Sequence, residues 1–288
     1  MNERIAVMPL LSIKELEQAS SIFRGRVGNH MGRSLMHMLD VDGINQLYDR
    51  NSHLSGPEFA GSVLRDVGLN YTLSIFSSRS SNPYATLSDM LPDGPFITIS
   101  NHPCGHLDGI SLVDIFGHLR PDYKVMVNDI LGRITPLEEN FITVTPTGTR
   151  RTAPTSASIS GIRAALQHLR SGGALGLFPS GAVSDLSMKD MSVRDRKWQE
   201  PVLRLIKKAG VPVLPVHFLD GNSDFYYALG LLSWKIRLLR LPAEVFNKKG
   251  KEFRICVGPL ISPAMLDALP LDDGTLEVFL RSSVYHLI

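Results

Sequence analysis

The chain has 288 residues, of which 43% are hydrophobic and 20% are charged, and its formal net charge is +2. A disordered chain would be poorer in apolar residues and richer in net charge. A dedicated nucleic-acid-binding protein would carry a large basic surplus, so we expect no nucleic-acid partner. Two cysteines provide neither a disulfide framework nor a four-cysteine zinc site.

No segment has the pattern of a membrane span or a signal peptide. The longest uncharged apolar stretch, residues 225–234, is far shorter than the roughly 20 residues that cross a bilayer. The N-terminus has charges on both sides of a short apolar stretch and lacks a small-residue cleavage site, so we expect no signal peptide. The composition therefore predicts an intracellular globular protein.

The first ninety residues predict an N-terminal helical segment. Apolar residues recur at three- and four-residue spacing, as on one face of a helix, over residues 12–25, 32–50 and 57–68. Residues 70–76 fit a strand. Residues 77–94 are rich in Ser, Pro, Asn and Asp, and we expect them to form a loop that ends this segment.

Short apolar runs then alternate with helical patterns. The expected strands are residues 96–100, 123–127, 141–145, 174–178, 211–218 and 252–257, and the expected helices are residues 109–118, 155–170 and 199–209. Buried strands that alternate with helices are typical of an α/β fold. We therefore predict a mixed, largely parallel sheet flanked by helices over residues 91–262, followed by a C-terminal tail over residues 263–288.

The most informative stretch follows the strand at residues 96–100. The strand leads into Asn101 and His102, Gly105 permits a tight turn, and Asp108 stands where an N-cap begins the next helix. An imidazole beside a carboxylate forms a general base, since the carboxylate fixes the tautomer and stabilises the imidazolium. His102 and Asp108 are therefore candidate catalytic residues.

Other interpretations of this stretch remain open on these residues alone. Asp108 alone fits a simple helix cap, and His102 fits a structural turn residue. His102, Cys104, His106 and Asp108 alternate and are all metal-ligand types, but a proline and two glycines interrupt a straight strand, and we expect no metal. Cys104 beside a histidine also has the composition of a nucleophile site.

A second stretch ends the strand at residues 174–178 with Phe178, Pro179, Ser180 and Gly181. Backbone N–H groups in such a turn can hold an anion. It is not a phosphate-binding Walker loop, because no Gly-Lys-Ser/Thr follows, and it is not a Gly-x-Ser-x-Gly elbow. A plain strand-end turn is the alternative.

In this order, the stretches resemble the glycerolipid acyltransferase family of the lysophospholipid acyltransferase (1-acylglycerol-3-phosphate acyltransferase-like) type. Its first motif appears as Asn101, His102 and Asp108, with five residues between His and Asp where four are common. That spacing is similar to the branch of hemolysin-like proteins and lyso-ornithine-lipid acyltransferases. The Phe-Pro-Glu-Gly motif appears as Phe-Pro-Ser-Gly, and a Val-Pro-x-x-Pro motif appears at residues 211–215. The resemblance covers roughly residues 40–262.

The resemblance implies the glycerolipid acyltransferase fold and acyl transfer from a thioester, either acyl-CoA or acyl carrier protein, to the hydroxyl of a lysolipid. His102 would take the hydroxyl proton and Asp108 would orient His102. Backbone N–H groups in the turn at Gly105 or at residues 178–181 would stabilise the oxyanion. No cofactor beyond the thioester co-substrate is implied. The substrate-binding residues implied are Asn101, Gly105, Phe178, Pro179, Ser180, Gly181, Arg150 and Arg151.

Two departures from the family pattern concern the acceptor. Ser180 replaces the usual Glu, and the arginine of the second motif is missing from its place after Phe141 and Ile142, while Arg150 and Arg151 follow later. We therefore expect a lyso-amino-acid lipid such as lyso-ornithine lipid as the acceptor. The alternatives are 1-acylglycerol-3-phosphate and, with water as the acceptor, a His/Asp thioesterase or hydrolase.

Amphiphilic substrates imply a peripheral enzyme at the cytoplasmic face of a membrane. Residues 140–184 lack Asp and Glu but contain four arginines, which suits an anionic ligand or lipid surface; chance clustering on a solvated face is the alternative. Residues 225–241 combine bulky apolar side chains with Trp234, Lys235, Arg237 and Arg240, a composition typical of interfacial segments. Two alternatives remain for the membrane contact. Residues 225–241 would instead form a buried helix with a cationic end, or the N-terminal helices would contact the membrane in their place.

Overall fold

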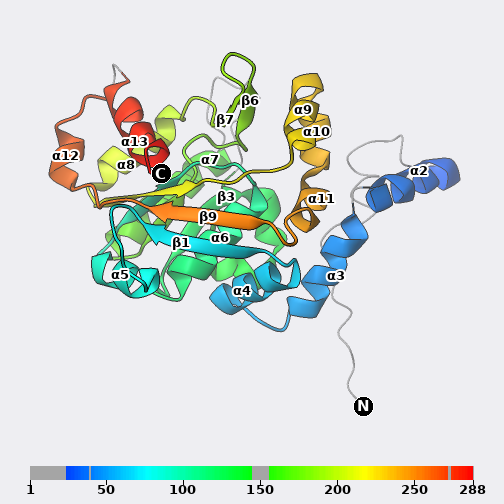
Figure 1. The fold of residues 1–288 in the computed structure, drawn as a ribbon, viewed down its shortest axis with the longest axis horizontal. Coiled ribbons are helices and arrows are strands. Elements are labelled where there is room, and N and C mark those ends of the chain that lie inside the picture. The colour runs from blue at the N-terminus through cyan, green and yellow to red at the C-terminus, as the bar shows by residue number, and fades with distance from the viewer. Residues whose placement is uncertain (1–23, 39, 145–155, 272–273, 288) are drawn as a thin grey trace.

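A seven-stranded sheet forms the centre of the computed structural model, which describes residues 24–38, 40–144, 156–271 and 274–287 (Figure 1). The strands are, in spatial order, β1 (Asn70–Ile75), β9 (Glu252–Val257), β8 (Val213–Phe218), β2 (Ile97–Ser100), β5 (Leu175–Leu177), β3 (Lys124–Asn128) and β4 (Phe141–Val144). Every neighbouring pair is parallel except β8 and β9, which are antiparallel. The predicted mixed, largely parallel sheet is therefore confirmed.

The central strands are buried on both faces, which explains why their sequences are continuous apolar runs. All four residues of β2 are buried, and so are all three of β5. The predicted strand at residues 252–257 has the bounds of β9, and the other predicted strands agree with the structure to within about two residues. β1 was predicted as a strand and lies at the edge of the sheet, paired with β9.

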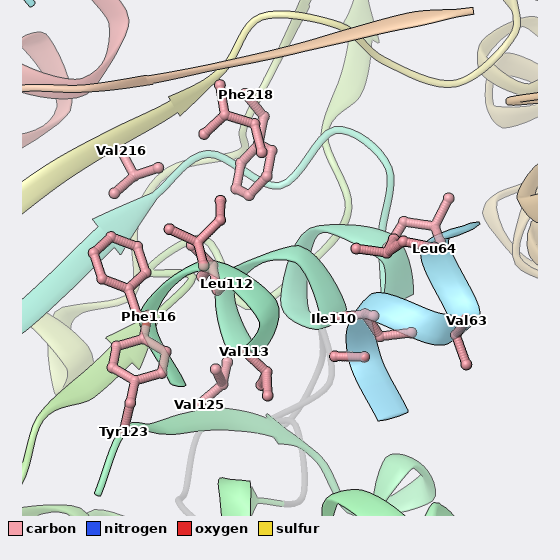
Figure 2. Close-up of a cluster of buried hydrophobic side chains, with 14 of the residues drawn as sticks. Val63, Leu64, Ile110, Leu112, Val113, Phe116, Tyr123, Val125, Val216 and Phe218 are labelled. Carbon is pink, nitrogen blue, oxygen red and sulfur yellow. The ribbon is translucent and has the colours of Figure 1, made fainter. Parts of the chain in front are cut away.

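One face of the sheet is covered by α3 (Val41–Asn51), α4 (Gly56–Asp66) and α6 (His106–Gly117). Figure 2 shows how Leu112 and Phe116 of α6 lie between the sheet residues Val216 and Val125. α6 has ten buried residues out of twelve, so it is a core helix that begins at the end of β2. The packing of α6 therefore fixes the position of the loop at residues 101–105.

The other face is covered by α7 (Ser156–Arg170), α8 (Glu200–Ala209) and α13 (Thr275–Tyr285). Leu203 and Ile206 of α8 and Leu280 of α13 are buried in one cluster with Ile97 and Val213 of the sheet. Sequence patterns predicted α7 and α8, whereas the short α12 (Pro263–Asp267) and α13 lie in the expected tail. The division into segments at residues 90 and 262 stays a prediction, and both outer segments contribute to these two cores.

One helix prediction and one loop prediction were wrong in detail. Residues 32–50 form parts of two helices, α2 (Gly25–Met38) and α3, because the chain turns at Asp40, whose φ is +56°. The expected loop at residues 77–94 contains α5 (Pro83–Met90), which Asn82 caps by accepting a hydrogen bond from the Ala85 N–H at 3.2 Å. Most of the predicted helix at residues 12–25 lies outside the described residues.

Beyond these layers, a hairpin and three consecutive helices stand at one end of the molecule (Figure 1). The hairpin consists of β6 (Asp185–Ser187) and β7 (Ser192–Arg194), and the helices are α9 (Asp224–Leu232), α10 (Trp234–Leu239) and α11 (Leu241–Phe246). Two 3₁₀ helices, η2 (Asp129–Arg133) and η3 (Thr135–Asn140), connect β3 to β4. Among the helices that the structure describes, none is long and apolar enough to cross a membrane.

Candidate active site

Two loops meet at the carboxyl ends of parallel strands. β2 pairs in parallel with β5 and β8, so the chain leaves these three strands at the same edge of the sheet. Ligands of open α/β sheets bind outside this edge. The loop after β2 carries His102 and the loop after β5 carries Phe178. Their ring centroids are 4.1 Å apart and their planes are 28° from parallel, so the two sequence motifs form one site.

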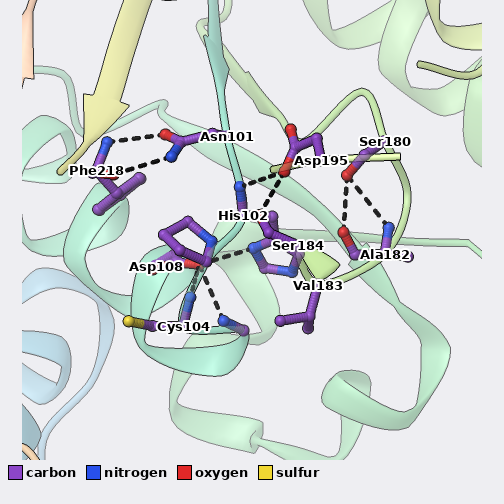
Figure 3. Close-up of polar contacts among 12 residues, drawn as sticks. Asn101, His102, Cys104, Asp108, Ser180, Ala182, Val183, Ser184, Asp195 and Phe218 are labelled. Atoms are coloured by element: carbon purple, nitrogen blue, oxygen red, sulfur yellow. Dashed lines mark hydrogen bonds and ion pairs between the residues drawn. The ribbon is translucent and has the colours of Figure 1, made fainter. Parts of the chain in front are cut away.

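His102 and Asp108 lie together as predicted (Figure 3). Nδ1 of His102 is 2.9 Å from Oδ2 of Asp108, and the exposed fractions of the two side chains are 18% and 0%. Because Nδ1 faces Asp108, the opposite ring nitrogen, Nε2, faces away from it. A buried carboxylate at Nδ1 of a partly exposed imidazole is the arrangement of a general base.

Asp108 also holds the turn that carries His102. Its Oδ2 accepts hydrogen bonds from the N–H groups of Cys104 and Gly105, both at 2.9 Å. Asp108 is the third residue of α6, and Gly105 is its N-cap, so the prediction of Asp108 as the N-cap itself was wrong. Helix capping and support of His102 are therefore combined in one oxygen atom.

Gly105 is required by the shape of this turn. Its φ is +75° and its ψ is −122°, a backbone conformation that side chains with a Cβ rarely adopt. A Cβ at this position would lie 3.1 Å from Cδ2 of Leu241 and 3.3 Å from Cγ2 of Val183. The turn is therefore closed on two sides by α11 and by the loop after β5.

Asn101 faces away from His102 and joins two strands. Its Nδ2 donates to the carbonyl of Phe218 at 2.9 Å, and its Oδ1 accepts from the N–H of Phe218 at 2.8 Å. The side chain is buried. This pair of hydrogen bonds ties the end of β2 to the end of β8, so in this structure Asn101 fixes the start of the loop that carries His102.

The turn at residues 178–181 is closed on itself. The N–H of Gly181 donates to the carbonyl of Phe178 at 2.9 Å, and the buried hydroxyl of Ser180 donates to the carbonyl of Ala182 at 2.7 Å. The N–H of Gln199 donates to the carbonyl of Pro179 at 2.8 Å. The amides of Gly181, Cys104 and Gly105, which belong to the two turns expected to bind the oxyanion, are thus all bonded within the protein.

The remaining predicted residues and alternatives are placed as follows. Arg150 and Arg151 lie outside the described residues. Cys104 is buried, its Sγ donates to the carbonyl of Asp220 at 3.8 Å, and burial raises the pKa of its thiol far above the usual range, which disfavours the thiolate that a nucleophile needs. No group of three His, Cys, Asp or Glu among the described residues could hold a metal ion.

An apolar pocket of about 130 Å³ lies beside the start of α6. Its lining comes from α3, α4, α6, η2 and α11 and consists of Ile44, Leu47, Tyr48, Phe59, Val63, His106, Leu107, Ile110, Leu131, Arg133, Ile134, Pro242 and Val245. Burial, and then the neighbouring His102, lowers the pKa of His106 to about 4. His106 is therefore a neutral imidazole in this pocket near neutral pH. Residue spacing did not reveal the pocket, because its walls come from segments far apart in the chain.

Asp195 is a buried residue of this site that the sequence did not single out. One of its carboxylate oxygens accepts a hydrogen bond from the N–H of His102 at 3.1 Å. It lies 93 residues after His102 in the sequence, and the only signal near it is the Arg-Lys-Trp pattern at residues 196–198.

Comparison with known proteins decides the family. A family model described as acyltransferase matches residues 15–287. The chain belongs to this acyltransferase family. The resemblance seen in the sequence is thereby confirmed, and the protein is an enzyme of the acyltransferase class.

Two relatives are both named lyso-glycine lipid O-acyltransferase and are each 24% identical to this chain. The alignment with the one from Bacteroides thetaiotaomicron is 249 positions long and covers 77% of this chain and 88% of the relative. The alignment with the one from Phocaeicola vulgatus is 276 positions long and covers 87% of this chain and 95% of the relative. Among solved structures, the 1-acyl-sn-glycerophosphate acyltransferase PlsC of Thermotoga maritima is similar over 87% of this chain and 89% of its own, with a TM-score of 0.44 and 15% identity.

Proposed function

We propose that this acyltransferase transfers a fatty acyl group from a thioester to the hydroxyl of a lyso-amino-acid lipid, with His102 as the general base. The observation that carries the proposal is the 2.9 Å contact between Nδ1 of His102 and the buried Asp108, with the other ring nitrogen directed away from it. A pair of this kind accelerates proton transfer by about 10²–10⁴-fold.

In the proposed reaction, Nε2 of His102 takes the proton of the acceptor hydroxyl as its oxygen attacks the thioester carbonyl. A carbon–oxygen bond forms and the carbon–sulfur bond breaks. The leaving thiolate takes up the proton that His102 received, which restores the neutral imidazole. Asp108 stabilises the imidazolium while it exists, and the ring stack with Phe178 limits the rotation of the imidazole. No covalent enzyme intermediate is needed.

The acceptor class is supported by two observations. The relatives from Bacteroides thetaiotaomicron and Phocaeicola vulgatus are both named for a lyso-glycine lipid. In this chain Ser180 takes the place of the family's Glu, and its hydroxyl is buried and bonded within its own turn. A lyso-glycine or lyso-ornithine lipid therefore fits better than 1-acylglycerol-3-phosphate as the acceptor.

An acceptor panel tests this proposal. The purified enzyme is supplied with lyso-glycine lipid, lyso-ornithine lipid or lysophosphatidic acid, each with acyl-CoA and with acyl carrier protein as donor, and lipid products are identified by mass spectrometry. We expect O-acylation of an amino-acid lipid at the highest rate. Preferred acylation of lysophosphatidic acid, or release of free fatty acid at the same rate without acceptor, would contradict the proposed acceptor and indicate one of the two alternative reactions.

We also propose that the enzyme works peripherally at the cytoplasmic face of a membrane, through a surface formed by α9, α10 and the turn of the β6–β7 hairpin. The large apolar side chains exposed there are Phe225, Leu231, Leu232, Trp234, Leu238, Leu239, Met188 and Met191, and the exposed fraction of Leu232 is 83%. Contiguous exposed apolar surface with tryptophan is typical of an interfacial contact. We call this set the α9–hairpin surface.

Two further observations support this role. The segments that carry the α9–hairpin surface, residues 184–197 and 224–240, contain seven Lys and Arg against four Asp and Glu. This basic surplus favours anionic lipids. The surface also borders the active site, because Nη1 of Arg237 donates to the carbonyl of Ser184 at 2.9 Å and the N–H of Ser184 donates to the carbonyl of His102 at 2.9 Å.

Arg237 itself does not face solvent as the interfacial interpretation requires. Its side chain is 2% exposed and pairs with Asp185 at 2.6 Å, so its charge is neutralised inside the protein. The apolar residues, and not Arg237, are therefore the ones to test. The partition coefficient onto phosphatidylglycerol vesicles, measured by co-sedimentation, should fall about 100-fold for the double variant Leu232→Ser/Trp234→Ser, since each truncation removes roughly 1.5 kcal/mol or more of apolar burial.

The matched control is the double variant Met265→Ser/Val278→Ser, which removes two exposed apolar side chains from α12 and α13. These helices stand at the opposite end of the molecule from α9 and α10 (Figure 1). We expect the control to bind vesicles as the wild type does. Equal binding by both double variants and the wild type would contradict the α9–hairpin surface as the membrane contact.

A further inference from the structure

The carboxylate of Asp195 connects the groups that hold the backbone of His102 (Figure 3). Its Oδ1 accepts a hydrogen bond from the His102 N–H at 3.1 Å and from the Ser184 hydroxyl at 2.6 Å. The Ser184 N–H donates in turn to the His102 carbonyl at 2.9 Å. Both backbone polar groups of His102 are therefore fixed through one carboxylate and its serine partner.

The same residue is held in place from the other side of the sheet. Its second oxygen, Oδ2, accepts from Nε1 of Trp198 at 3.2 Å. Its backbone N–H donates to the hydroxyl of Tyr285 at 2.8 Å, and its carbonyl accepts from Nη2 of Arg281 at 2.6 Å. Tyr285 and Arg281 belong to α13, so the C-terminal helix reaches the catalytic histidine through Asp195.

Asp195 is a buried carboxylate whose charge is compensated by hydrogen bonds. Asp195 is 4% exposed, and burial raises the pKa of its carboxyl, while the Ser184 and Trp198 donors and His102 oppose that rise. A buried charge is costly unless it is paired, and the groups that compensate it here include the peptide N–H of His102. The buried carboxylate therefore holds in place the backbone of the residue that carries the chemistry.

We propose that Asp195 is a positioning residue for catalysis: it fixes the peptide of His102 from behind, while Asp108 orients the imidazole from the side. This proposal rests on the general-base role of His102 in the proposed function. Loss of the Asp195 carboxylate displaces His102 both before and after the substrate binds. We therefore expect this loss to lower kcat more than it raises KM.

The test is Asp195→Asn, with release of free thiol from the acyl thioester measured with and without acceptor. The oxygen of the amide can replace only one oxygen of the carboxylate, and an NH₂ group replaces the other. The variant therefore loses the charge, and its NH₂ group faces a hydrogen-bond donor, either Nε1 of Trp198 or the hydroxyl of Ser184. Because small misplacements of a catalytic group cost up to about 10²-fold, we expect kcat to fall about 10–100-fold with KM within about threefold. We also expect the acid limb of the pH–rate profile to move to lower pH, since removal of a nearby anion disfavours the imidazolium.

The matched control is Asp122→Asn, which makes the same change at a residue between α6 and β3 whose carboxylate pairs with Arg120 at 2.8 Å; its kinetics should match the wild type. Asp195→Asn with wild-type kcat and an unchanged pH profile would overturn the proposal. If Asp195→Asn does not fold, Ser184→Ala, which keeps the carboxylate and removes one of its donors, should lower kcat about 3–10-fold. A folded Ser184→Ala enzyme with wild-type kcat would overturn the proposal as well.

A second measurement needs no substrate. Hydrogen–deuterium exchange of the peptide that spans residues 97–109 should be faster in Tyr285→Phe, which removes the hydroxyl that accepts from the Asp195 N–H. Tyr84→Phe, which removes a hydroxyl bonded to Tyr71 at 2.8 Å, is the control and should leave exchange at His102 unchanged. Equal exchange in both variants would count against the proposal. A wild-type enzyme without acceptor-dependent thiol release would instead contradict the proposed function, so the two failures are distinguishable.

Discussion

Asp108→Asn separates the charge of Asp108 from its shape. In the structure Oδ2 accepts hydrogen bonds from the N–H groups of Cys104 and Gly105, both at 2.9 Å, and lies 2.9 Å from Nδ1 of His102. Among the residues that the structure describes, none forms a hydrogen bond with Oδ1. The amide oxygen of an asparagine can therefore take the place of Oδ2 and keep all three contacts, with its NH₂ group at the position of Oδ1. The variant then loses mainly the negative charge.

The size of the effect follows from Coulomb's law. Unit charges 2.9 Å apart interact by about 6 kcal/mol at an effective dielectric constant of about 20, which is an upper bound on the support that Asp108 gives to the imidazolium. Each 1.36 kcal/mol corresponds to a factor of ten in rate, so the bound is about 10⁴-fold. We expect kcat to fall about 10²–10⁴-fold, the range of general-base catalysis.

The assay measures acceptor-dependent thiol release and the urea unfolding midpoint of the same preparations. Asp108→Asn should lose activity with a loss of stability of about 2 kcal/mol, because two hydrogen bonds to a charged acceptor become neutral ones. The matched control is Asp114→Asn on the same helix, whose carboxylate accepts from the hydroxyl of Tyr71 at 2.6 Å, and it should retain activity. An Asp108→Asn enzyme within threefold of the wild-type kcat would refute the reasoning.

Three more predictions concern the frame of the site. Gly105→Ala should lower both the melting temperature and kcat, because φ is +75° and a Cβ would lie 3.1 Å from a Leu241 atom. The control Gly210→Ala, with φ +60° and no atom within 4 Å of its Cβ, should leave kcat unchanged. An equal loss of kcat in both variants would contradict the role of the turn. Asn101→Ala should cost about 1–3 kcal/mol for each backbone group of residue 218 left unpaired, measured by urea unfolding, and a cost near zero would contradict the clamp. Because the pKa of His106 is lowered to about 4 in the fold, protonation of His106 favours the unfolded chain. The free energy of unfolding is therefore highest above about pH 6.5 and falls by up to about 3 kcal/mol as the pH falls towards 4. His106→Gln should therefore flatten the pH dependence of unfolding in this window, and an unchanged slope would contradict the assignment.

The sequence predicted the sheet and the proximity of His102 and Asp108 because both have local signals. Buried strands such as β9 are short apolar runs with clear ends, and His102 and Asp108 lie six positions apart on one turn. α5 was missed because its Ser- and Asp-containing sequence resembles a loop, although Asn82 and Pro83 are the residues of a helix start.

The rest of the site depends on contacts between distant segments. Asp195 reaches His102 across 93 residues, and the Arg-Lys-Trp pattern that follows it does not indicate that its carboxylate is buried against His102. Arg237 was expected at an interface because of its neighbours, yet it is buried against Asp185. Pairing partners of this kind are set by the sheet order and by the course of the loops, which residue spacing does not encode.

The central claim is that His102 acts as the general base in acyl transfer to a lysolipid hydroxyl. The most direct test is mass spectrometry of the lipid products from the wild type and from His102→Ala, with lyso-glycine or lyso-ornithine lipid and an acyl thioester. We predict O-acylated lipid from the wild type and a rate lower by about 10²–10⁴-fold from a folded His102→Ala enzyme. A folded His102→Ala enzyme that forms the same product at the wild-type rate would contradict the account.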